Sequence, residues 1–217
     1  KTRFKRECFF LHFMELYFAT TNQGKVRSLE RDLNPYGITI IPVPMELPEP
    51  RSSDVKEIAI HKVLHAYEHL QAPVIAIDAG FYIDSLNGFP RAFVNFALET
   101  IGLQGIIDLV YGKDRRCEFR ECLAYMDNRL EEPECFLGNV KGRISEEKKG
   151  KRQEYHWSEL SQIFIPDGTE KTLAELDEEE YLSWKRMKDG EDSYRRKFIN
   201  WYLENRKNKQ IVIPDNI

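Results

Sequence analysis

A polar segment early in the chain has the composition of a phosphate-binding loop. Thr20-Thr21-Asn22-Gln23-Gly24-Lys25 follows the short apolar run 16–19 and precedes apolar residues at helical spacing, so we expect it between a strand and a helix. The start of a helix offers free backbone N–H groups and partial positive charge, and Lys25 would add a full charge. The segment lacks the glycine spacing of a Walker loop, and such segments are more often ordinary polar turns.

Two acidic residues are placed where a metal ligand or a general base could be useful. Asp78 follows the apolar run 74–77 and precedes Gly80, which predicts a position at the carboxyl end of a strand, where open α/β sheets bind their ligands. The alternative is an aspartate that only caps the next turn. Glu49 lies in a loop held by flanking prolines, a rigidity that suits a ligand but also occurs in loops without function.

One expected helix carries a histidine every four residues and a lysine among them. His61, His65 and His69 would share one helical face, which at first suggests a metal site. Helical angles turn that face away from the apolar stripe and toward solvent, and no carboxylate completes the set, so we favour a plain surface role. Lys62 borders the apolar stripe instead and could reach into a cleft.

The end of the chain mixes basic and aromatic residues. Residues 195–209 contain six lysines and arginines around Phe198, Trp201 and Tyr202, a mixture that can bind single-stranded nucleic acid by stacking. The apolar residues recur at helical spacing, however. We therefore favour an amphipathic terminal helix docked by its aromatic face.

Composition limits the class of protein. The chain has 217 residues, of which 41% are hydrophobic and 31% charged, enough for one sizeable core. The net charge of -4 means that the chain as a whole is not built to coat nucleic acid. The four cysteines show no zinc spacing, which fits a reducing cytoplasm. No apolar run approaches the roughly 20 residues that cross a bilayer.

The expected elements alternate between the two periodicities. We predict one α/β (mixed α+β) domain over residues 14–205, with an extension at 1–13 and a tail at 206–217. The expected strands are 16–19, 38–43, 74–77, 117–126, 134–140 and 155–157. The expected helices are 26–33, 53–70, 92–101, 104–111 and a charged helical region from 172.

Several of these segments occur together, and in order, in one known family. Over roughly residues 14–203 the chain resembles the inosine triphosphate pyrophosphatase family, also called the Ham or RdgB family. The similar blocks are residues 19–25, 47–49, 76–81, 86–90, 164–168 and 172–176. Chance similarity of so many ordered blocks is improbable, although each alone would be weak.

The resemblance implies a two-lobed domain around an elongated mixed sheet, with a nucleotide cleft between the lobes. It implies Mg²⁺-dependent hydrolysis of deaminated purine nucleoside triphosphates to the monophosphate and pyrophosphate, by a cytoplasmic protein that is commonly a homodimer. Asp78 would be the catalytic residue, and Glu49 with Asp78 would hold the metal. The substrate-binding residues would be Thr20, Thr21, Asn22, Lys25, Lys62, Ala79, Tyr194 and Arg195.

The departures from the family pattern fall in the expected pocket. Ile77 replaces an acidic residue, Ala79 a hydroxyl residue and Arg91 a glycine, while Ser161 stands where an aspartate is expected. The family's Ser-His-Arg element, which holds the purine, occurs only as Ser193-Tyr194-Arg195 or, less closely, Ser183-Trp184-Lys185. The chain is thus identified as a divergent member with altered base-recognition motifs, and Asn95 occupies a position that is lysine in some members.

Two other functions remain open at this point. A relative with weakened catalysis could bind nucleotide without turning it over, which release of pyrophosphate would test. A single-stranded nucleic-acid binder would use the terminal helix, and its salt-sensitive binding would survive loss of Asp78.

Overall fold

The computed structural model describes residues 14–48, 50–156, 158–188, 190 and 193–207. In this part of the chain seven strands form one mixed sheet in the order β2-β1-β3-β5-β6-β7, with β4 paired to the upper part of β3. The strands are β1 Met14–Ala19, β2 Ile38–Val43, β3 Val74–Ile83, β4 Pro90–Arg91, β5 Arg116–Met126, β6 Glu134–Ile144 and β7 Phe164–Pro166. The predicted mixed α/β class is confirmed.

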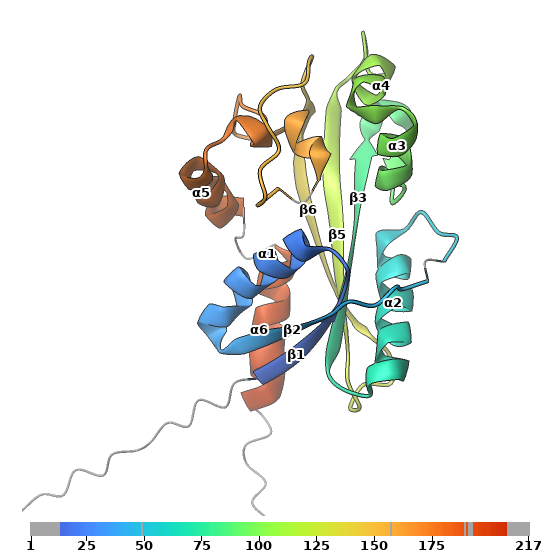
Figure 1. Ribbon diagram of the computed structural model, residues 1–217, viewed down its shortest axis with the longest axis vertical. Helices are drawn as coiled ribbons and strands as arrows, with labels where there is room; N and C mark the ends of the chain where they lie inside the picture. Colours follow the sequence, from blue (N-terminus) through green and yellow to red (C-terminus); the bar gives the residue numbers. More distant parts are fainter. Residues whose placement is uncertain (1–13, 49, 157, 189, 191–192, 208–217) are drawn as a thin grey trace, which may run out of the picture.

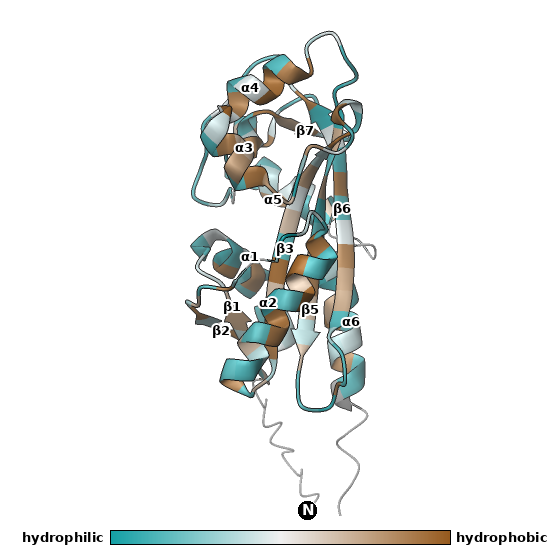
Figure 2. Ribbon diagram, turned by 90° about the vertical axis from the view of Figure 1, so that its right-hand side faces the viewer, coloured by the Kyte–Doolittle hydropathy of each residue, from teal (hydrophilic) through white to brown (hydrophobic). Residues whose placement is uncertain are grey.

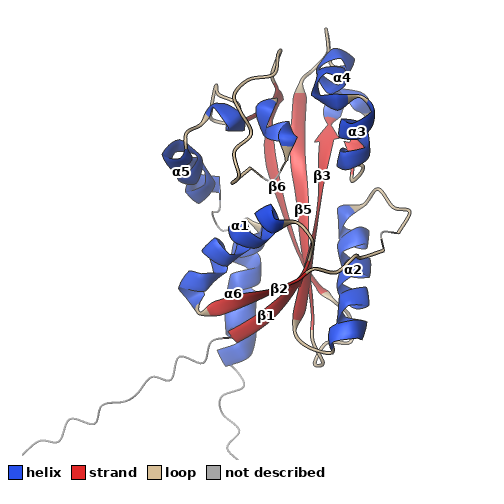
Figure 3. Ribbon diagram, viewed as in Figure 1, coloured by secondary structure: helices blue, strands red, loops and turns tan. Residues whose placement is uncertain are grey.

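Three long strands connect the two ends of the molecule. β3, β5 and β6 are antiparallel neighbours, and Figure 3 shows them running through both lobes. β1 and β2 are parallel and flank only the lower part, where β1 reaches β3 through the pair Phe18 and Ile75. Since β1 ends at Ala19, β3 continues without that neighbour, and this step in the sheet opens the site described below.

The helices cover the sheet in separate groups (Figures 1 and 2). One apolar cluster packs α1 and α6 on the sheet, another packs α2, and a third joins α3 and α4 to the opposite end. The helices are α1 Gln23–Leu33, α2 Val55–Leu70, α3 Val94–Thr100, α4 Gly102–Leu109, α5 Glu178–Lys188 and α6 Tyr194–Lys207. None of the helices within the described residues is long and apolar enough to span a membrane.

Two local predictions were wrong. Residues 155 and 156 form a turn rather than a strand, and the last strand is β7 instead. Asp78 does not end a strand, because β3 runs through it to Ile83. The Gly80 that suggested a turn is required for close packing, since a Cβ there would lie 2.7 Å from the carbonyl oxygen of Arg91.

The predicted terminal helix is α6, and its aromatic face is docked as expected. Phe198 and Tyr202 are fully buried, and their rings pack against Tyr125 on β5. Gly138 on β6 allows the start of α6 to approach, because a Cβ there would lie 2.9 Å from the backbone nitrogen of Tyr194. The rings that a nucleic-acid binder would need for stacking are therefore part of the core.

Candidate active site

An open cleft of about 650 Å³ lies between the lobes. It is lined by the start of α1, one face of α2, the middle of β3, α3 and the loop that follows residue 151. The lining residues that the sequence singled out are Asn22, Lys25, Lys62, Asp78, Ala79 and Asn95. These side chains come from segments up to 73 residues apart, and the step between β1 and β3 brings them to one place.

The start of α1 presents a helix end to this cleft. The Asn22 side chain caps the helix by accepting a hydrogen bond from the Lys25 backbone N–H at 3.0 Å, and the Thr20 hydroxyl accepts one from the Asn22 N–H at 3.1 Å. The Lys25 ammonium reaches across to the Ile77 carbonyl oxygen at 3.2 Å. This arrangement holds a full positive charge beside the positive end of the helix dipole. Thr21 is exposed and does not line the cleft.

Asp78 and Lys62 form a close ion pair at the side of the cleft. The Lys62 ammonium lies 2.6 Å from Asp78 Oδ1, and their side chains are 12% and 10% exposed. Asp78 shares the sheet face on which α2 packs, because it pairs with the buried Cys122 of β5. Lys62 can also give up this contact, because a flexible lysine side chain can rotate away when another cation binds the Asp78 carboxylate.

The oxygen donors of the cleft fit a magnesium ion. Magnesium takes oxygen ligands and is usually held by one or two carboxylates, with water and substrate phosphates completing the shell. Asp78 supplies a largely buried carboxylate, and Glu99 and Glu159 also line the cleft. Glu49, the other predicted ligand, lies outside the described residues. Among the residues that are described, no group of three His, Cys, Asp or Glu side chains could hold a metal by itself.

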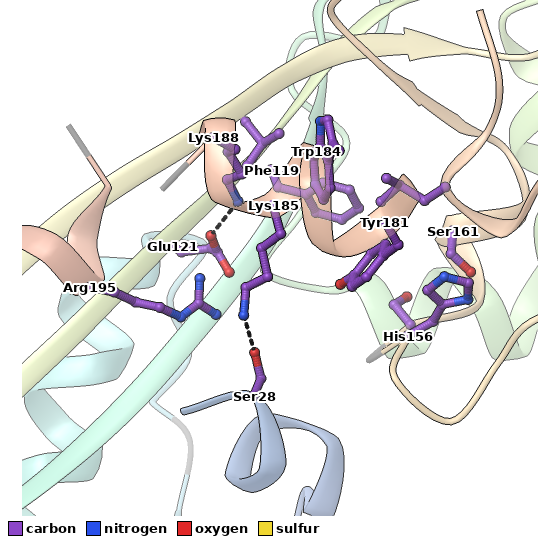
Figure 4. Close-up of a pocket in the computed structure, with 13 residues that line it drawn as sticks. Ser28, Phe119, Glu121, His156, Ser161, Tyr181, Trp184, Lys185, Lys188 and Arg195 are labelled. Atoms are coloured by element: carbon purple, nitrogen blue, oxygen red, sulfur yellow. Dashed lines mark hydrogen bonds and ion pairs between the residues drawn. The ribbon is translucent and has the colours of Figure 1, made fainter. Parts of the chain in front are cut away.

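The cleft continues into the interior through two narrower cavities. Lys25 and Ala79 line both the cleft and a small cavity beneath it, and Arg195 lines both that cavity and a deeper pocket of about 40 Å³. Ser158 also lines the cleft and the deeper pocket. Figure 4 shows the deeper pocket, which is enclosed by β5, α5, α6 and the segment around residue 156.

A buried charge cluster forms one wall of this pocket. The Lys185 ammonium donates to Ser28 Oγ at 2.9 Å and to Asp32 Oδ2 at 2.8 Å, and Arg195 Nε lies 3.1 Å from the same carboxylate oxygen. Burial, together with the nearby Arg195 charge, lowers the pKa of Lys185 to about 8 against the attraction of Asp32. Two cations thus share one carboxylate at the edge of the pocket.

A second buried carboxylate balances the cluster. Glu121 projects from β5 and is 6% exposed, with its Oε2 atom 3.4 Å from the Lys188 ammonium. Burial alone would raise the pKa of Glu121, but the charges of Lys188 and Arg195 outweigh it and hold the pKa below its usual range. The pocket therefore contains an ionised acceptor as well as donors.

The comparisons with known proteins agree with this geometry. A model of the Ham1 family matches residues 16–186. The chain belongs to the Ham1 family. Relatives named dITP/XTP pyrophosphatase include one from Methanopyrus kandleri, 35% identical over 88% of this chain and 98% of its own, and one from Pyrococcus horikoshii, 36% identical over 77% and 87%.

Solved structures show the same fold. The Staphylococcus aureus Ham1 protein aligns with a TM-score of 0.67 at 24% identity, over 90% of this chain and 100% of its own. A Mycobacterium abscessus nucleoside-triphosphatase / dITP/XTP pyrophosphatase aligns with a TM-score of 0.65 at 23% identity, over 81% and 95%. The predicted two-lobed architecture of the Ham1 family is thereby confirmed.

The structure accounts for some departures from the Ham1 family pattern. Arg91 has a φ of 58°, a left-handed conformation that explains why glycine usually stands there. Ile77 is buried in the α1 and α6 cluster and contributes its carbonyl oxygen, rather than a side chain, to Lys25. Both possible counterparts of Ser-His-Arg reach the same pocket, because Lys185 and Arg195 each line it. Tyr194 is 2% exposed and lies beneath the Arg195 guanidinium, 4.4 Å from its centre.

Sequence reasoning missed several residues that line the deep pocket or contact its lining. Asp32, Glu121 and His156 gave no motif. Glu121 could have been noticed as a charged residue at the start of the otherwise apolar run from Glu121 to Met126, in which every residue is buried. The three histidines of α2 do not reach either cavity, and His61 and His69 are exposed.

Proposed function

We propose that the protein hydrolyses nucleoside triphosphates with deaminated purine bases, releasing the monophosphate and pyrophosphate. One observation carries the proposal: a cleft with Lys25 at a helix start and the Lys62–Asp78 pair leads inward to a buried pocket that is rich in hydrogen-bond donors. Phosphates suit the first part and a planar polar base suits the second. The relatives named dITP/XTP pyrophosphatase, whose names give nucleotides with bases of this class, support the same assignment.

The proposed role of each residue follows from its position in the cleft. Asn22 and the first N–H groups of α1, with Lys25, bind the phosphate chain, while the Thr20 hydroxyl holds the loop by accepting a hydrogen bond from the Asn22 N–H. Lys62 donates to a phosphate oxygen when it leaves Asp78. Asp78 then accepts the proton of the water that attacks the α-phosphorus, as a general base must lie within hydrogen-bond reach of that proton.

Magnesium would be held by Asp78 and Glu49. The bound ion supplies positive charge that offsets the growing negative charge on the leaving pyrophosphate. In the chain itself, Ala79 allows the phosphate chain to pass close to β3 because its methyl group occupies little space at the cleft wall. Arg195, supported by Tyr194, donates to a carbonyl oxygen of the base.

The test is a panel of nucleoside triphosphates incubated with the full chain and magnesium, scored separately for pyrophosphate and orthophosphate. We expect pyrophosphate from inosine and xanthosine triphosphates at a higher kcat/KM than from adenosine triphosphate. Release of orthophosphate would mean attack at the γ-phosphorus and would overturn the proposal. Tight binding with no product would indicate a nucleotide-binding relative instead.

A further inference from the structure

Two buried polar atoms of the deep pocket lack a hydrogen-bond partner among the described residues. They are His156 Nε2 and Ser161 Oγ, on residues that are 3% and 5% exposed. Both residues line the pocket, and Figure 4 shows them together at the side away from Arg195. A buried polar group without a partner costs about 1 to 3 kcal/mol, so such atoms are retained where a ligand can satisfy them.

The hydrogen-bond pattern fixes what His156 can offer. The backbone N–H of Gln153 donates to His156 Nδ1 at 3.0 Å. Burial lowers the pKa of His156 to about 4; the Leu173 carbonyl opposes this and Arg152 adds to it, so the ring is neutral at physiological pH. A neutral imidazole carries one hydrogen, and because Nδ1 accepts, the hydrogen is on Nε2. The Leu173 carbonyl is close enough to raise the pKa of the ring, while Nε2 makes no hydrogen bond within normal distance and angle to any described residue.

The pocket therefore has donors on opposite sides. Arg195 lies at one side of the pocket and His156 at the opposite side, with Lys185 and Tyr181 between them in the view of Figure 4. An adenine amino group is itself a hydrogen-bond donor, so it cannot accept a hydrogen bond from Arg195 or His156. A base carbonyl oxygen instead satisfies a buried donor, and a site built this way rejects an analogue that leaves it unpaired.

We infer that His156 Nε2–H is a specificity-determining donor that binds a carbonyl oxygen of the purine, with Ser161 Oγ as a second contact at the same end. The inference rests on the proposed function and names the preferred base. Xanthine has two carbonyl oxygens on its six-membered ring and can meet both Arg195 and His156. Hypoxanthine has one and can meet only one of them, and adenine meets neither.

Entry of a base requires the pocket to widen. Its volume of about 40 Å³ is far below the roughly 300 to 1,000 Å³ of ligand sites. Trp184 and Lys185 line it from α5, which packs on the rest of the molecule through partly buried rings. A purine therefore fits only if lining side chains such as Trp184 and Lys185 are displaced, and the inference includes that displacement.

The experiment compares kcat/KM for xanthosine, inosine and adenosine triphosphates in the parent, His156→Phe and His156→Gln. Phenylalanine fills the space without a donor, and glutamine restores an N–H near the Nε2 position. We expect His156→Phe to lower the ratio of xanthosine to adenosine triphosphate by about tenfold, the effect of one unpaired buried donor, and the ratio for inosine by less. His156→Gln should recover most of the xanthosine preference.

Two further variants make the result decisive. Tyr155→Phe alters the neighbouring side chain, which does not line the pocket, and should leave all ratios unchanged. Ser161→Ala should lower the same xanthosine ratio by a smaller factor, and it serves as the test if His156→Phe does not fold. Equal losses on all three substrates, or no recovery with glutamine, would overturn the inference and leave His156 a structural role. A parent without pyrophosphate release from any of them would instead reject the proposed function.

Discussion

The phosphate end and the base end of the cavity system are built in different ways. The phosphate end is open and uses backbone geometry, with a capped helix start and a step between two strands, together with the close pair of Lys62 and Asp78. The base end is enclosed and uses buried side chains that share charges, with Lys185 and Arg195 on one carboxylate. The phosphate end depends on how the strands of the sheet are connected. The base end depends on how segments late in the chain pack against earlier ones.

The departures from the Ham1 family pattern fall at both ends, with Ala79 and Asn95 at the phosphate end and Ser161 at the base end. The phosphate groups are common to every nucleoside triphosphate, so a helix start and a lysine serve all of them. Base recognition depends on individual donors and acceptors, and it can be rebuilt from other side chains if every buried polar group again finds a partner. The phosphate end should therefore control turnover and the base end should control choice between substrates, which the following variants test.

Asp78→Asn should give the largest effect. The amide preserves the shape of the side chain but removes the negative charge that serves as base and metal ligand, so kcat should fall by at least about 100-fold. The unfolding midpoint should remain close to that of the parent, because Lys62 lines the open cleft and can turn to water. Asp84→Asn, which removes an exposed carboxylate in the loop after β3, is the matched control. Near-normal turnover in Asp78→Asn would exclude Asp78 from the reaction.

Lys25→Ala should follow, acting on binding. Lys25 is assigned to phosphates that a monophosphate lacks, and charge-assisted hydrogen bonds contribute about 1.5 to 3 kcal/mol. The Kd for a non-hydrolysable triphosphate analogue should rise by roughly tenfold or more, and the Kd for the monophosphate should change little. Calorimetry on both ligands, with the exposed Lys56→Ala as control, measures the difference. An equal loss for both ligands would place Lys25 elsewhere on the nucleotide.

The two ends also differ in how far the sequence could predict them. Asn22, Lys25 and Lys62 were predicted because local rules describe them: a polar loop before a helix, and a lysine at the border of an apolar stripe. The strand position of Asp78 was predicted wrongly, because Gly80 was interpreted as a turn when its role is close packing against Arg91. Local sequence patterns indicate where the chain changes direction. They do not show where a glycine is needed because a neighbouring segment leaves no room for a side chain.

The base end is decided by contacts between distant segments. Lys185 contacts Ser28 and Asp32, more than 150 residues earlier, and no spacing rule connects them. His156 was placed in a predicted strand, yet it lies in a turn that faces the pocket. Only the family resemblance assigned Arg195 to base binding, through the partial match of Ser193-Tyr194-Arg195 to the family's Ser-His-Arg motif.

Arg195→Ala tests whether the base end controls substrate choice. The arginine donates to a base carbonyl oxygen in the proposed complex, so its loss should lower the ratio of kcat/KM for inosine to that for adenosine triphosphate by about five- to tenfold. Arg196→Ala removes the next arginine, which contacts Tyr36 on the outside of the helix, and should leave the ratio unchanged. The same ratio in parent and Arg195→Ala would mean that Arg195 only supports the fold, and would remove the contrast between the two ends.

The smallest expected effect concerns stability and comes from Lys185. Its pKa is about 8 in the folded protein, against about 10.4 in an unfolded chain. Between these values the unfolded chain binds more protons than the folded one, so this group makes the free energy of unfolding rise with pH from about 8 to 10.4. Lys185→Met should abolish that contribution. Urea unfolding at pH 7.5 and pH 9.5 should show the parent gaining on the order of 1 kcal/mol relative to the variant, while Arg186→Met, at an exposed position of α5, should follow the parent. If the stabilities of the parent and Lys185→Met respond identically to pH, Lys185 is not desolvated. That result would contradict the description of the base end as enclosed.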